Sequence, residues 1–320
     1  MKYFKGDIMK KFSFVLSVVA LLYGLNSCSD DSLDVTDNNE EPKAVDKTAN
    51  LQGTGDSAND LLSNDRFNKL KIEIAYVEGF QPTQEAIDGF IDYLKKRTFK
   101  EDIELVYQQL SSPDEDSLTL EEITDLESKN RTVYNEGSTL GIYIYFSDSP
   151  AEGDDLDEGL VTLGAVYRNT SMIIHEVTVR KLAKQSFFIS DTDVELTTLN
   201  HEFGHLFGLV NLGTDMVNDH EDDLVDENGE PEVDSNGNTK GNNHCAIEGC
   251  LMRAELQFGG PSNKGQSLLA KNPNSLKVPC RLNGLSVLKM LESRTARGLA
   301  EPPSLDAQCL LDLAGNGGRQ

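Results

Sequence analysis

The segment "TTLNHEFGHLFGLVN" constrains the fold more than any other part of the chain. It places His201 and His205 four residues apart, so in an α-helix both imidazoles project from one face and can bind one metal ion. Leu199 and Phe203 belong to an apolar stripe on the opposite face. The sequence therefore predicts a buried helix that presents two metal ligands, with the carboxylate of Glu202 beside them.

These residue types suit hydrolysis by a metal-activated water. Zinc accepts imidazole ligands and, at an open coordination position, lowers the pKa of a water to ~7. Glu202 is the predicted general base, because a carboxylate near that water can take its proton during attack on a carbonyl carbon. Gly208 lies three residues after His205, where glycine tolerates the left-handed conformation that lets the chain turn toward a third ligand.

Two histidines follow this turn, His220 in "NDHEDD" and His244 in "NHCAIEGCLM". We expect one of them to complete the zinc site. His220 has a second interpretation, as a ligand of calcium or of another metal ion together with Glu221, Asp222 and Asp223. A solvated charged loop is the simpler explanation of that acidic run.

The extended motif resembles the HExxHxxGxxH signature of the metzincin family of zinc metallopeptidases. Asn211, a poor zinc ligand, stands where that family has its third histidine. The string His-Cys-x4-Cys-x-Met is similar to the archaemetzincin arrangement, which implies His244 as the third ligand, with His220 as the alternate. The same resemblance implies Met252 as an apolar floor beneath the metal. Residues 211–243 would then be a long acidic insertion.

Alternating strand-like and helix-like periodicity predicts the order strand-helix-strand-helix-strand before the motif. The segments, in turn, are "KLKIEIAYV", a helix opening at Pro82-Thr83, "DIELVYQQL", "TLEEITDLESKN" and "GIYIYFS". Two further strand candidates, "GLVTLGAVYR" and "SMIIHEVTV", precede the motif helix, for which Thr192 and Glu195 form a capping-box pattern.

The metzincin resemblance implies an α+β zincin fold, with a twisted mixed sheet, the active-site helix and a C-terminal subdomain after the turn. It also implies that residues 163–168 form an edge strand to which a peptide substrate adds. A plain sheet strand with a glycine bulge remains the alternative for that stretch.

Four cysteines follow the motif helix, Cys245, Cys250, Cys280 and Cys309. An even number in an exported chain predicts two disulfides. The archaemetzincin resemblance implies a competing interpretation, a second, structural zinc held by Cys-x4-Cys and a later Cys-x2-Cys. Asp306 stands where the first cysteine of that later pair would be, so a complete four-cysteine site is in doubt.

The N-terminus predicts export, because two lysines precede an apolar run that is shorter than the ~20 residues of a membrane-spanning helix. The run ends in "LNSC", which resembles a bacterial lipobox and implies lipidation of Cys28. The following "SDDSLD" is similar to the acidic export tag of Bacteroidetes-type surface lipoproteins. We therefore expect a lipoprotein signal peptide at 1–28, a flexible acidic tether at 29–65 and a metallopeptidase domain at 66–320.

Acidic residues outnumber basic ones, 54 to 29, which excludes a nucleic-acid partner that clustered Lys and Arg would have to meet. The sequence thus predicts peptide-bond hydrolysis with one catalytic zinc, acting on a peptide or protein at the outer membrane or cell surface, with membrane contact only through the lipid anchor. Archaemetzincin likeness implies aminopeptidase cleavage and metzincins in general imply endopeptidases. The alternative is a non-catalytic surface binding or metal-scavenging lipoprotein that keeps the zincin helix. No oligomeric state is predicted.

Overall fold

The computed structural model describes residues 46–154, 160–226, 229–253, 282–299 and 302–320. In chain order the elements are η1 Thr48–Asn50, α1 Ala58–Leu62, β1 Lys69–Val77, α2 Gln84–Arg97, β2 Asp102–Leu110, α3 Leu120–Asn130, β3 Thr139–Phe146, β4 Leu160–Val161, β5 Gly164–Arg168, β6 Ser171–Ile174, α4 Glu176–Ala183, α5 Asp191–Leu206, β7 Glu221–Asp223, β8 Gly241–Cys245, β9 Leu282–Asn283, α6 Gly284–Ala296 and α7 Ala307–Gly315.

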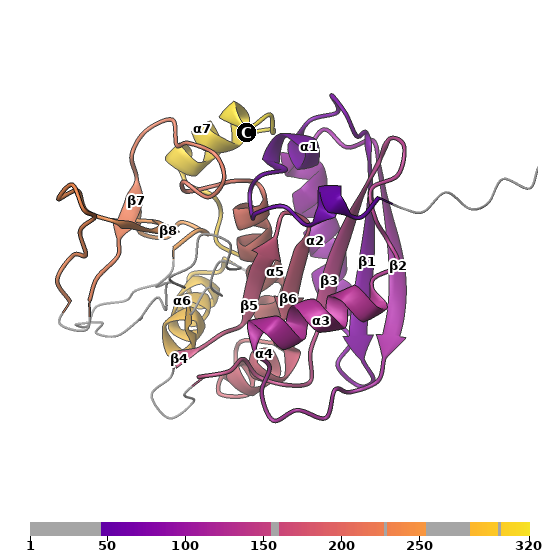
Figure 1. Ribbon diagram of the computed structural model, residues 1–320. Helices are drawn as coiled ribbons and strands as arrows, with labels where there is room; N and C mark the ends of the chain where they lie inside the picture. Colours follow the sequence, from indigo (N-terminus) through magenta and orange to yellow (C-terminus); the bar gives the residue numbers. More distant parts are fainter. Residues whose placement is uncertain (1–45, 155–159, 227–228, 254–281, 300–301) are drawn as a thin grey trace, which may run out of the picture. The chain divides into compact units, whose positions relative to one another are not determined.

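A five-stranded sheet in the order β2-β1-β3-β6-β5 organises the fold (Figure 1). Its strands are parallel except β5, which runs antiparallel to β6. In β3 the residues Ile142 and Ile144 join the core on one face, while Tyr143 and Tyr145 join the core on the other. A strand covered on both faces requires a nearly continuous apolar run, which explains the sequence "GIYIYF".

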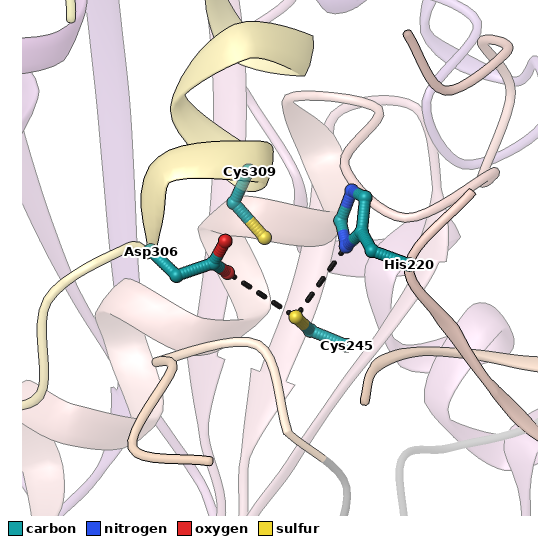
Figure 2. A group of neighbouring side chains, drawn as sticks. All are labelled: His220, Cys245, Asp306 and Cys309. Atoms are coloured by element: carbon teal, nitrogen blue, oxygen red, sulfur yellow. Dashed lines mark hydrogen bonds between the residues drawn. The ribbon is translucent and has the colours of Figure 1, made fainter. Parts of the chain in front are cut away.

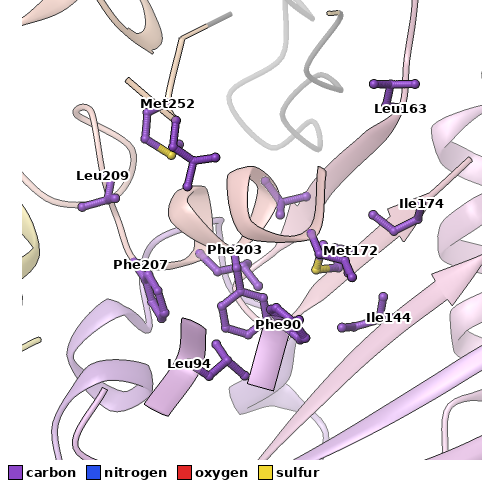
Figure 3. Close-up of a cluster of buried hydrophobic side chains, with 14 of the residues drawn as sticks. Phe90, Leu94, Ile144, Leu163, Met172, Ile174, Phe203, Phe207, Leu209 and Met252 are labelled. Carbon is purple, nitrogen blue, oxygen red and sulfur yellow. The ribbon is translucent and has the colours of Figure 1, made fainter. Parts of the chain in front are cut away.

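Helices cover both faces of the sheet. α2 and α5 lie over one face, where the ring centroids of Phe90 and Phe203 are 5.0 Å apart in an edge-to-face arrangement (Figure 3). On the other face Ile123 of α3 packs with the β3 tyrosines. Burial of a side chain such as Phe203 stabilises the fold by about 1.5–3 kcal/mol, so this packing holds α5 firmly on the sheet.

The alternating elements from β1 to β3 confirm the sequence prediction, and the sheet is mixed as expected. The prediction of one strand over "SMIIHEVTV" is wrong in its second half, because β6 ends at Ile174 and α4 begins at Glu176. Val179 and Leu182 are buried at helical spacing, and Arg180 pairs with Glu176 one turn earlier. That amphipathic spacing overrides the strand preference of β-branched residues.

The capping box of α5 also differs from the prediction. Ser190 and Asp193 form it, rather than Thr192 and Glu195. Asp193 can take the capping role because its carboxylate reaches back to the backbone N–H of Ser190, at 2.8 Å.

The predicted tether is wrong for residues 46–65, which are folded onto the domain. Leu61 and Leu62 of α1 are in the main core, and the buried Asn50 side chain donates to Gly141 O and Thr170 Oγ1. The predicted export signal, Cys28, the rest of the tether and Cys280 lie outside the described residues. Among the described helices, none has the length and apolar content needed to cross a membrane.

Candidate metal centres

Helix α5 ends in a sharp turn. Phe207 is its C-cap, and Gly208 follows with φ +74°. A Cβ on Gly208 would lie 2.7 Å from Thr214 Oγ1, so the position requires glycine for space as well as for conformation. Val210 and Asn211 also have positive φ, +57° and +58°. The chain therefore turns away from the helix axis immediately after the motif.

Three histidines converge beside this helix, His201 and His205 from α5 and His244 from β8. Their ring centroids are 4.9 Å (201 to 205), 5.4 Å (201 to 244) and 5.0 Å (205 to 244) apart. One ring nitrogen from each lies within 4.8 Å of the others, and all three rings are buried. The structure thus brings His244, and not His220, to the predicted pair. Three imidazoles with an open fourth position suit a catalytic zinc.

Burial keeps these imidazoles neutral, which is the form that binds metals. It lowers the pKa of His201 to about 4 and that of His244 to about 3. The pKa of His205 falls well below its usual value, through burial first and then through the other two imidazoles. His201 Nδ1 lies 2.7 Å from Leu251 O, so Nδ1 carries the proton and the lone pair is on Nε2.

Glu202 lies next to these ligands with its carboxyl fully buried. Burial raises its pKa to about 8, and the nearby backbone N–H of Val166 opposes that rise. Neither carboxyl oxygen has a well-formed hydrogen bond within the described part of the chain. Strand β5 packs directly against the Glu202 side chain, since a Cβ on Gly164 would lie 2.9 Å from Glu202 Cγ. A buried carboxyl with no well-formed hydrogen bond among the described residues, beside three neutral imidazoles, fits a site that takes a metal ion and a water.

Met252 follows β8 in the chain and packs against α5 at Gly204. It is fully buried, and a Cβ on Gly204 would lie 2.2 Å from its Sδ. Sequence reasoning missed Gly204 as the residue that admits Met252, although a glycine inside a helix costs about 1 kcal/mol relative to alanine and usually has a packing reason. It also missed the Leu251 carbonyl, which no spacing rule would have indicated.

His220, the alternate third ligand, lies in a separate cluster with Cys245, Asp306 and Cys309 (Figure 2). One candidate ligand atom from each lies within 4.8 Å of the others. His220 Nδ1 is 3.4 Å from Cys245 Sγ, and Nε2 is 2.8 Å from the Asp312 carboxylate. The ring is therefore not directed at the acidic run that follows it, as the calcium interpretation required.

The described cysteines, Cys245, Cys250 and Cys309, are all free thiols. The Sγ atoms of Cys250 and Cys309 are 3.6 Å apart, against about 2.05 Å in a disulfide. The disulfide prediction is therefore wrong for pairs among these three. Cys245 and Cys309 instead lie in the cluster with the His220 imidazole and the Asp306 carboxylate.

Comparisons with known proteins find one similar structure. No protein-family model matches the sequence, and the search of curated proteins finds no match. The chain is similar to the crystal structure of archaemetzincin from Methanopyrus kandleri, at 14% sequence identity and a TM-score of 0.42. The similarity covers 78% of this chain and 97% of that one.

Proposed function

We propose that the chain is a zinc-dependent peptidase in which His201, His205 and His244 hold the metal and Glu202 is the general base. One observation carries the proposal. Three neutral, buried imidazoles surround one point beside a buried carboxyl whose two oxygens lack partners among the described residues. A purely structural cluster would leave those polar atoms buried without compensation, which is costly.

Bound zinc supplies Lewis acidity and lowers the pKa of a water to ~7. Glu202 takes the proton of the attacking water and returns it to the leaving amine. Because its oxygens have no well-formed hydrogen bond within the described residues, the carboxylate can accept a hydrogen bond from water. The Leu251 carbonyl holds His201 in the tautomer that ligates through Nε2.

Strand β5 is the proposed substrate-binding edge. It is the last strand of the sheet within the described residues, and it runs antiparallel to β6. An extended peptide can pair with such an edge through backbone hydrogen bonds. Since Gly164 brings β5 against Glu202, a peptide paired there would pass close to the carboxylate.

The proposed cellular setting is the cell surface, with lipid attachment at Cys28 and a peptide or protein as substrate. The apolar run ending in "LNSC" and the acidic residues after it support this setting. Detection of a diacylglycerol-modified Cys28 by mass spectrometry of the protein purified from membranes would test it, and an unmodified or cleaved cysteine would contradict it.

Hydrolysis of a quenched fluorescent peptide library, measured together with zinc content, tests the function. We expect Glu202→Gln to keep the wild-type zinc content and to lower kcat/KM by about 10²–10⁴-fold. His244→Ala should lose zinc from this centre and lose hydrolysis. Glu121→Gln, an exposed change on α3, is the matched control and should match the wild type. Bound zinc without cleavage in the wild type would instead favour a binding protein.

A further inference from the structure

We propose that Glu221 is the positioning residue that orients His244 in the three-histidine site. Its carboxylate links Asn211, where the chain leaves the motif helix, to Asn243, which precedes His244 in β8. The long insertion 211–243 can then supply the third imidazole although position 211 is not a histidine. The effects on zinc binding and hydrolysis rest on the proposed function, whereas the contacts of Glu221 can be measured without metal.

Both carboxylate oxygens of Glu221 take part in this link. Oε1 accepts from the backbone N–H of Asn243 at 2.5 Å, and Oε2 accepts from the side-chain Nδ2 of Asn211 at 3.1 Å. Asn243 Nδ2 adds two longer contacts, to Glu221 Oε1 at 3.3 Å and to Asn211 O at 3.4 Å. Hydrogen bonds to an ionised carboxylate are stronger than those between neutral groups. One side chain therefore joins two segments that are 32 residues apart in the chain.

Strand β8 departs from regular pairing where Glu221 contacts it. Glu221 of β7 pairs with Cys245 of β8. The next paired positions are Asp223 and Gly241, so two steps along β7 (221 to 223) face four steps along β8 (245 to 241). The surplus residues of β8 form a bulge that includes Asn243, at φ +62° in the left-handed region. Because bulges re-aim side chains, this one determines where the next side chain of β8, the third imidazole, points.

Gly241 gives the Glu221 carboxylate the space to reach the bulge. A Cβ on Gly241 would overlap the carboxyl carbon and both carboxyl oxygens of Glu221. The backbone of Gly241 is not in the left-handed region, so glycine serves there for space and not for conformation. This close fit distinguishes Glu221 from Asp223 in the same strand, whose side chain is exposed.

The bulge also fixes the tautomer of His244. Its Nδ1 lies 2.8 Å from the backbone carbonyl oxygen of Asn242, so Nδ1 carries the proton and Nε2 keeps the lone pair that a metal needs. The backbone N–H of His244 donates to Asn242 Oδ1 at 2.9 Å. The two residues before the imidazole thus hold it in place, and the Glu221 carboxylate holds the nearer of them, Asn243.

The other end of the link lies in the turn after the motif helix. Asn211 has φ +58°, a conformation that asparagine tolerates better than most residues. Its side-chain amide can donate to a carboxylate, which a zinc ligand at the same position could not do while it bound the metal. Asn211 therefore contributes to the site through Glu221 and not as a ligand.

Zinc affinity of the three histidines, measured on the full chain by competition with a chelator, tests the proposal. Zinc retained by the double variant His201→Ala/His205→Ala is subtracted, so that binding elsewhere is not counted. We expect Glu221→Ala to weaken the affinity by about 10–100-fold and to lower hydrolysis at limiting zinc. Asp223→Ala removes the same charge from the same strand and is the matched control, which should bind zinc as the wild type does.

Two conservative variants separate the position of the carboxylate from its charge. Glu221→Gln keeps an acceptor for the Asn243 N–H and can donate to the turned amide of Asn211, so its affinity should stay within about fivefold of the wild type. Glu221→Asp keeps the charge but is too short to reach the bulge, so it should resemble Glu221→Ala. The reverse order, a weak Glu221→Gln and an unchanged Glu221→Asp, would mean that charge alone acts and would overturn the proposal.

Hydrogen exchange of the Asn243 amide in the metal-free protein gives a readout that does not depend on zinc. This amide should be protected in the wild type and in Glu221→Gln, and should exchange at least about tenfold faster in Glu221→Ala and Glu221→Asp. Unchanged exchange and zinc affinity in Glu221→Ala, with an active wild type, would overturn the role of Glu221 and leave the peptidase standing. The expected exchange and affinity changes without peptide hydrolysis by the wild type would support Glu221 and count against the peptidase.

Discussion

The buried carboxyl groups of Glu176 and Glu195 should make the protein less stable as the pH rises, whereas most acidic groups make a folded protein more stable as the pH rises. Glu176 on α4 and Glu195 on α5 are both fully buried. Glu195 Oε2 accepts from Thr83 N–H at 2.9 Å and from Thr83 Oγ1 at 2.5 Å, and Arg180 Nε donates to Glu176 Oε1 at 2.5 Å. Burial, and then the charge of Glu195, raise the pKa of Glu176 from 4.5 to about 9.

The substitution Glu176→Gln isolates this effect. The folded protein keeps on Glu176 a proton that the unfolded chain releases above pH 4.5, so stability falls as pH rises from 4.5 toward 9. The slope is about 1.4 kcal/mol per pH unit, which amounts to about 3 kcal/mol at pH 7. Glutamine has the shape of the protonated acid, can donate to Glu195 and accept from Arg180, and has no proton to lose. Glu176→Gln should therefore raise the free energy of unfolding by about 3 kcal/mol at pH 7 and by nearly nothing at pH 4.

Urea unfolding of both proteins at a series of pH values between 4 and 8 measures this difference. Titrating groups that do not interact with Glu176 contribute to both curves and cancel in the difference. Glu195→Gln is the matched control and should destabilise at pH 7, because the N–H and the hydroxyl of Thr83 both donate to the carboxyl oxygen that is replaced. A difference for Glu176→Gln that does not change with pH, or that is destabilising at pH 7, would refute the reasoning.

Three glycine substitutions and metal removal test the rest of the site. Gly204→Ala should displace Met252 and destabilise the fold by about 1–3 kcal/mol in urea unfolding, with a loss of peptide hydrolysis. Gly208→Ala should cost about 1–2 kcal/mol, because φ +74° is left-handed and Thr214 is close. Gly315→Ala, whose Cβ would be 3.5 Å from Val217 Cγ2, should stay within about 0.5 kcal/mol of the wild type. A chelator should abolish peptide hydrolysis and added zinc should restore it; hydrolysis that survives chelation would contradict a metal mechanism.

The parts of the site that sequence could predict are those encoded over short distances. One helical turn separates His201 from His205, so periodicity alone places them on one face. His244 belongs to a different element, and only a resemblance singled it out. Asp312 lies 92 residues from His220, and no spacing rule connects a loop histidine with an aspartate in the last helix.

The errors in the predicted tether and in the predicted disulfides have the same origin. Both predictions rested on composition, which does not say where an individual residue packs. Residues 46–65 are polar as a group, yet Leu61 and Leu62 reach the core and Asn50 satisfies buried backbone and hydroxyl groups. An even count of cysteines likewise suggested pairs, whereas Cys245 and Cys309 lie in one cluster with His220 and Asp306.

The acidic insertion 211–243 lengthens the connection between the motif helix and His244. Asn211 has φ +58° and its side chain donates to Glu221 Oε2 at 3.1 Å, so the chain leaves the helix there without contributing a ligand. The connection from His205 is 39 residues long to His244 and would be 6 residues long to position 211, and this difference adds about 1.7 kcal/mol of closure entropy. Zinc binding contributes on the order of 10 kcal/mol, so a metal held by His201, His205 and His244 would more than offset that term.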